Sequence, residues 1–98
     1  MFARVTTIEG GNPTTIDESA QFARENILPR ARQMDGWKGV ISLADRTTGE
    51  EFLITLWESE AAMNASAEAA KSLRAESYTT GEREATVHGY DVVIFETG

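Results

Sequence analysis

The side chain best suited to proton transfer at neutral pH is the single histidine, His88. Imidazole is the side chain that ordinarily gains and loses its proton in this range, so His88 is the natural candidate for a general base. Tyr90 stands two positions further and shares the same face of an expected strand, which places a phenol beside the imidazole. The alternative is a hydrogen-bonded or exposed strand histidine, because no second catalytic group is fixed beside His88 in the sequence.

Three further side chains could contact an aromatic or charged substrate. Trp57 closes an apolar segment and could form the wall of a pocket, and Trp37 could do the same; the alternative for both is a tryptophan of the core or of an interface. Arg4 shares a strand face with Phe2 and Thr6, and a charge within such a face is either paired or functional. It could hold an anionic substrate, or it could pair with one of the 16 acidic residues.

Two candidates belong to an expected helix in the second half of the chain. The side-chain amide of Asn64 could bind a carbonyl group, or it could be an ordinary exposed helix residue. Tyr78 stands where that helix is expected to end, and it could contact a substrate or anchor the packing.

Composition excludes several classes of protein. The 98 residues are enough for one domain, 1–98. The absence of cysteine and the single histidine exclude thiolate and multi-imidazole metal sites. A net charge of −7 opposes binding to nucleic acid or to an anionic membrane. With no long apolar run and no secretory pattern at the N-terminus, we expect a cytoplasmic protein.

The hydropathy pattern predicts four strands and two helices. Period-two alternation predicts the strands Phe2–Ile8, Trp37–Ala44, Glu51–Trp57 and Val87–Glu96. Helical spacing of apolar residues and helix-forming composition predict the helices Ile16–Met34 and Glu60–Ser77.

Local signals refine the first helix. Thr15 with Glu18 fits a capping box at its start. Pro29 lacks a backbone donor and should kink the helix or end its first half near Leu28. Gly36 is a suitable left-handed cap after its end.

The predicted order β-α-β-β-α-β is the ferredoxin-like arrangement, an α+β fold. It places two helices on one face of a four-stranded antiparallel sheet. The segments Glu51–Trp57 and Val87–Glu96 carry apolar residues on both faces. We therefore expect a second copy to cover the other face, giving a homodimer that forms an α+β barrel.

Two segments resemble the antibiotic biosynthesis monooxygenase family. The stretch Glu51–Ala62 is an apolar strand ending in Trp57, followed by Ser59 as a helix cap and a helix of small residues. It is similar to the strand-to-helix junction of that family. The stretch Leu28–Gly39 resembles the family's helix end, with glycine, an aromatic residue and a short strand. The resemblance covers nearly the whole chain in element order and implies a dimeric α+β barrel.

The resemblance also implies a reaction. It points to a cofactor-independent monooxygenase that acts on a small aromatic or polyketide-like substrate without metal or flavin. In that mechanism the substrate is deprotonated and its carbanion reduces oxygen directly, in an apolar pocket whose few polar groups orient the phenol. The implied catalytic residues are His88 and Tyr90. The implied substrate-binding residues are Trp57, Trp37, Asn64, Arg4 and Tyr78.

Other functions fit the same fold. One alternative is a non-catalytic dimeric barrel that binds a small apolar metabolite, or a structural or stress-related member of the superfamily. An isomerase of small lactones is a third. Haem-degrading relatives place a haem-ligating histidine in the second helix with a second tryptophan nearby, and the second helix here has neither. The enzyme is favoured if His88, Tyr90 and one tryptophan converge on the helix side of the sheet.

Overall fold

A computed structural model describes residues 1–69, 71–72 and 84–98. Four strands form one antiparallel sheet in the order β2-β3-β1-β4. The strands are β1 (Phe2–Glu9), β2 (Trp37–Ala44), β3 (Glu51–Trp57) and β4 (Glu84–Asp91). The helices are α1 (Ile16–Phe22), α2 (Leu28–Ala31) and α3 (Glu60–Ala65), with a 3-10 turn η1 (Pro13–Thr15) and a π-helical turn η2 (Ala23–Ile27). This confirms the predicted ferredoxin-like α+β fold.

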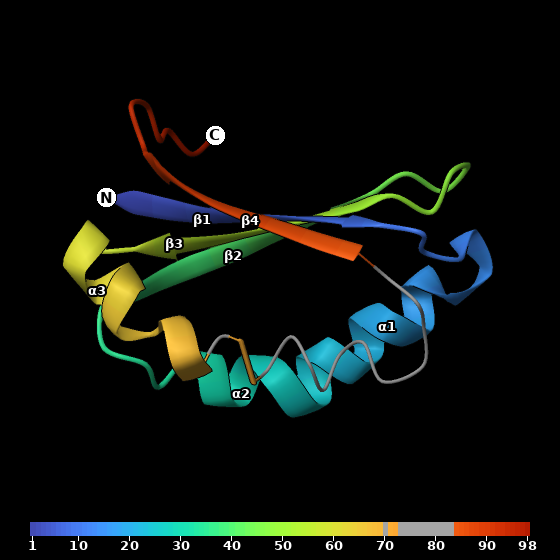
Figure 1. The fold of residues 1–98 in the computed structure, drawn as a ribbon, viewed down its shortest axis with the longest axis horizontal. Helices are drawn as coiled ribbons and strands as arrows, with labels where there is room; N and C mark the ends of the chain where they lie inside the picture. Colours follow the sequence, from blue (N-terminus) through green and yellow to red (C-terminus); the bar gives the residue numbers. More distant parts are fainter. Residues whose placement is uncertain (70, 73–83) are drawn as a thin grey trace.

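The sheet has one face covered by helices and one without them. Figure 1 shows α1, α2 and α3 on one side of the sheet, with only the C-terminal tail on the other. We call these the helix face and the open face. Among the described residues, no helix is long and apolar enough to span a membrane.

The first helical region changes its hydrogen-bonding pattern just before Pro29, close to the position that the sequence predicts. The backbone N–H of Leu28 bonds to the carbonyl of Ala23, which widens η2, and α2 then starts with Pro29 in its first turn. A π turn moves the preceding carbonyls away from the proline ring, which would otherwise meet one of them. The predicted capping box is wrong, because Thr15 makes no side-chain bond to the helix. Instead Asn12 caps η1 by accepting from the backbone N–H of Thr14.

Two predicted element ends are also wrong. The last strand ends at Asp91 and not at Glu96, because its one neighbour β1 begins at Phe2, directly opposite Asp91. The second helix reaches Ala65, where a turn interrupts it, and residues 67–69 and 71–72 are helical again. Its predicted continuation over 73–77 lies outside the described residues.

Two contacts hold the connections between elements. Arg46, in the β2–β3 turn, forms a two-pronged ion pair with Asp17 of α1 at 2.9 and 3.0 Å. Hydrogen bonding and charge from Arg46 hold the pKa of Asp17 below its ordinary value. At the other end, Gly36 has a φ of 80° and lies directly against the Cβ of Ala62. A side chain at Gly36 would force α3 away from the end of the first helical region.

The buried cation Arg4 connects the sheet to α3. Its side chain is 5% exposed on the helix face. The Nη2 atom donates to the carbonyl of Met63 at 2.6 Å and to Oγ of Ser66 at 3.2 Å. The guanidinium also lies 5.3 Å from the ring centre of Trp57. Ser66 accepts this bond where α3 is interrupted, so a tertiary contact coincides with the end of the helix.

We predict that Arg4→Met lowers the free energy of unfolding by about 2 kcal/mol or more, because the carbonyl of Met63 and the hydroxyl of Ser66 lose a charged donor in a buried place. Arg4→Lys should lower the free energy of unfolding by less, since lysine keeps the positive charge but lacks the planar fork of donors. Urea denaturation followed by circular dichroism measures both changes. Arg32→Met, at an exposed arginine after α2, is the control. Wild-type stability of Arg4→Met would contradict this role.

Candidate functional site

Two tryptophans stand beside Arg4 on the helix face. Trp57 is 1% exposed, and its indole N–H donates to Oγ1 of Thr55 at 2.9 Å. The ring of Trp37 meets that of Trp57 edge to face, with centres 5.5 Å apart and planes at 88°. Trp37 is only half-buried. Trp57 therefore belongs to the packed core, while Trp37 extends this aromatic pair toward the surface.

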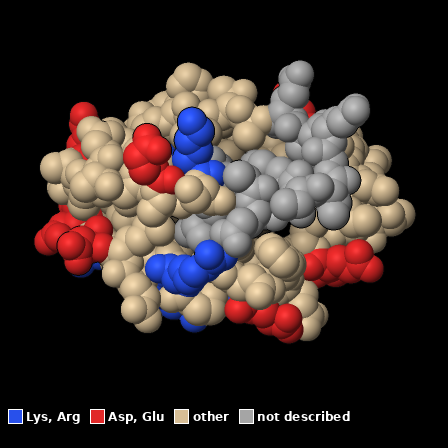
Figure 2. Space-filling view, turned by 60° about the horizontal axis from the view of Figure 1, so that its bottom comes forward, with Lys and Arg blue, Asp and Glu red and all other residues tan. Residues whose placement is uncertain are grey.

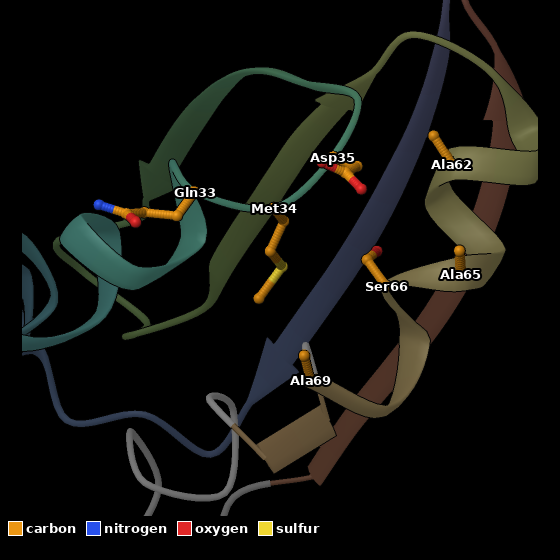
Figure 3. Close-up of a pocket in the computed structure, with 7 residues that line it drawn as sticks. All are labelled: Gln33, Met34, Asp35, Ala62, Ala65, Ser66 and Ala69. Carbon is orange, nitrogen blue, oxygen red and sulfur yellow. The ribbon is translucent and has the colours of Figure 1, made fainter.

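A pocket of about 330 Å³ opens next to this cluster, between the end of the first helical region and α3. We call it the α3 pocket. Its described lining residues are Gln33, Met34, Asp35, Ala62, Ala65, Ser66 and Ala69. Figure 3 shows Met34, Asp35 and Ser66 directed into the space between the two segments, while Gln33 points away. Its size lies at the lower end of the range for small-molecule sites.

The polar groups of the pocket differ in what they can offer a ligand. The hydroxyl of Ser66 donates to the carbonyl of Met63 at 2.8 Å and accepts from Arg4. Asp35 is exposed and is the one ionisable side chain among the described lining residues. The remaining lining residues are Met34, three alanines and Gln33, whose side chain points away from the space. This combination suits a flat apolar molecule with few polar atoms.

The predicted catalytic pair lies on the other side of the sheet. His88 pairs with Val5 and Tyr90 with Ala3, the two neighbours of Arg4, so both side chains lie on the open face. Their rings are 6.3 Å apart and inclined by 51°. His88 and Tyr90 therefore share a face, as the alternation predicts. They do not converge with a tryptophan on the helix side, and the arrangement that would favour the enzyme is absent.

The other predicted residues divide between the two layers. Arg4, Trp37 and Trp57 gather on the helix face next to the α3 pocket. Asn64 is exposed on α3 and is not among the residues that line the pocket. Tyr78 lies outside the described residues. The structure thus brings together three of the seven candidates.

Sequence reasoning missed the residues that line the pocket. The one available signal is the helix of small residues predicted after Ser59. Ser66 interrupts that pattern with a hydroxyl, but its bond to Arg4 joins residues 62 positions apart and has no local signal.

The open face carries no charged side chain along most of the sheet. Its positions in the four strands are Ala3, Val5, Thr7, Gly39, Ile41, Leu43, Phe52, Ile54, Leu56, Thr86, His88 and Tyr90. Glu9 stands beyond them at the end of β1, where it is paired with Glu84 of β4. On the helix side, by contrast, Figure 2 shows acidic side chains at several separate places and basic side chains in small groups. In a chain with 26% charged residues, this distribution leaves the open face as a surface with few charges.

Sequence comparison finds relatives in one organism. No protein-family model matches the chain. The chain is 31% identical over 94 residues to Rv2558, an uncharacterised protein of Mycobacterium tuberculosis. The matched residues are 96% of this chain and 39% of that protein. A second uncharacterised protein of the same organism, Rv2557, is 35% identical over 74 residues, covering 76% of this chain and 33% of that protein. The chain spans well under half the length of these curated relatives.

Solved structures share the whole fold. The heme-degrader MhuD from M. tuberculosis, with two hemes in its active site, has a TM-score of 0.72 at 21% identity and covers 99% of this chain and 100% of its own. An antibiotic biosynthesis monooxygenase has a TM-score of 0.65 at 21% identity, and the match covers 94% of this chain and 99% of that protein. The monooxygenase ActVA-Orf6 of Streptomyces coelicolor, in complex with nanaomycin D, has a TM-score of 0.62 at 20% identity, covering 98% and 92%. The resemblance seen in the sequence is thereby confirmed at the level of the fold: the chain shares the fold of these antibiotic biosynthesis monooxygenase-like structures.

Proposed function

We propose that this chain is a monooxygenase that binds a small aromatic or polyketide-like substrate in the α3 pocket. The observation that carries the proposal is the pocket itself, which joins an apolar wall to the buried cation Arg4 through Ser66. The likeness to ActVA-Orf6, a monooxygenase solved with the ligand nanaomycin D, supports the choice of substrate class.

The pocket fits the chemistry that the family resemblance implies. In a reaction without metal or flavin, deprotonation leaves negative charge on the substrate, and the resulting carbanion then passes its electrons to oxygen. Arg4 lies behind Ser66 in a buried place, where a positive charge acts more strongly than it does in water. Met34 and the alanines of α3 provide apolar contacts for a bound ring.

A second candidate function follows from the position of His88 and Tyr90. Both lie on the open face, away from the α3 pocket, so neither can act on a ligand held there. This favours a non-catalytic barrel that binds a small apolar molecule in the same pocket. The same position argues against haem ligation by histidine in the α3 pocket, since His88 is the one histidine of the chain.

Oxygen consumption by metal-free protein with an anthrone substrate distinguishes the two functions. We expect uptake above the uncatalysed rate, and we expect Ala65→Trp to reduce it at least about tenfold, because the indole fills the pocket. Ala61→Trp adds the same ring at an exposed position of α3 that does not line the pocket, and it should retain activity. His88→Ala should also retain it.

Two results would contradict the enzyme. Absence of uptake across a panel of anthrones and hydroquinones would leave the binding function. Loss of uptake in His88→Ala, with Ala65→Trp unaffected, would move the active site to the open face and restore His88 as the general base.

We also propose that a second copy of the chain covers the open face. Two copies of a chain with a net charge of −7 repel each other unless the surfaces that meet carry little charge. The open face meets this condition along most of the sheet, with Glu9 at one end. It carries exposed apolar side chains, among them Ile41, Leu43 and Tyr90. Face-to-face packing of two sheets would remove these side chains from water and give the homodimeric α+β barrel.

Molar mass from light scattering at micromolar concentration tests the dimer. We expect a dimer for the wild type and a monomer for Ile41→Asp, which places a charge in the contact. Phe22→Asp is the matched control, because Phe22 on α1 is 41% exposed and Ile41 is 43% exposed. A monomeric wild type, or equal dissociation of both variants, would contradict the proposed interface.

A further inference from the structure

We propose that the α3 pocket selects neutral molecules that present a hydroxyl donor, with Asp35 as the acceptor, and rejects carboxylates of the same shape. This inference rests on the proposed function for the location of the site. It adds the chemical class of the ligand and a specificity-determining residue that the sequence did not single out.

The first observation is the balance of donors and acceptors in the pocket. The hydroxyl proton of Ser66 is already donated to the carbonyl of Met63, at 2.8 Å. Gln33 points away from the space. Among the described side chains directed into the pocket, the polar atoms that remain available to a ligand are therefore acceptors, chiefly the carboxylate of Asp35. A carboxylate accepts hydrogen bonds and donates none, so the ligand has to bring the donor.

The second observation is that Asp35 stands on a fixed segment. On one side, the backbone N–H of Met34 donates to Ala31 at 3.1 Å and the Met34 carbonyl accepts from Trp37 at 3.2 Å. On the other side, the Gly36 carbonyl accepts from the backbone N–H of Glu58 at 2.7 Å. Gly36 also lies directly against Ala62 of α3. These bonds hold the backbone around Asp35 before a ligand arrives, which is what a selective site requires.

The third observation is electrostatic. Asp35 is the one ionisable group among the described lining residues, and the positive charge of Arg4 behind Ser66 is already bonded to the Met63 carbonyl and the Ser66 hydroxyl. A ligand carboxylate placed beside the exposed Asp35 would meet a like charge, which is unfavourable. A phenol would instead form a charge-assisted hydrogen bond, which is stronger than a neutral one. The pocket therefore favours phenols over aromatic acids.

Isothermal titration calorimetry with three naphthalene probes tests the inference. The probes are 2-naphthol, which donates, 2-methoxynaphthalene, which does not, and 2-naphthoate, which is anionic. We expect 2-naphthol to bind roughly tenfold more tightly than 2-methoxynaphthalene, and 2-naphthoate to bind most weakly. Asp35→Asn removes the charge, so it should reduce the preference for 2-naphthol and increase the affinity for 2-naphthoate several-fold.

A matched control separates a local effect from net charge. Glu68→Gln removes one charge from an exposed side chain on the segment after α3, outside the lining residues of the pocket. It should leave the order of the three probes unchanged. An unchanged order in Asp35→Asn, a wild type that prefers 2-naphthoate, or no binding of any probe would overturn the inference.

The binding measurement is independent of oxygen chemistry, so the two proposals can fail separately. The predicted probe order without oxygen uptake would sustain the ligand class and remove the monooxygenase. Oxygen uptake that depends on Ala65, with no effect of Asp35→Asn on the probe order, would sustain the enzyme and remove the role of Asp35.

Discussion

The burial of one positive charge determines the arrangement of the helix face. A guanidinium at 5% exposure requires hydrogen-bond acceptors, and Arg4 finds them in the Met63 carbonyl and the Ser66 hydroxyl of the second helical region. These bonds fix α3 above β1 and place Ser66 at the pocket wall. The ring of Trp57 then covers the charge from the sheet side. The hydrogen bond from Arg4 to Ser66 therefore belongs both to the buried core and to the wall of the pocket.

The two faces of the sheet differ in how many charged groups they carry. The helix face buries a cation and borders a pocket with a carboxylate at its wall. The open face carries apolar side chains, one histidine and one tyrosine. A single sheet can serve two purposes in this way, because alternate residues of each strand point to opposite sides. The proposed division assigns ligand binding to one side and self-association to the other.

Alternation and helical spacing predicted the elements and their order, because each pattern is local. They did not predict where β4 ends, since that depends on the first residue of its neighbour β1. They did not predict the interruption of the second helix at Ser66, which coincides with a bond to Arg4. The side of the sheet on which a given side chain lies was harder to predict. Both sides of the predicted last strand carry apolar residues, so the pattern placed His88 and Tyr90 together without indicating which side they share.

The most direct test of this division is a backbone amide NMR titration of ¹⁵N-labelled protein with 2-naphthol. The account predicts the largest chemical-shift changes at Met34, Asp35 and Ser66, around the α3 pocket, with little change at His88 and Tyr90. The largest changes at His88 and Tyr90, with the pocket residues unmoved, would contradict it and place the ligand on the open face.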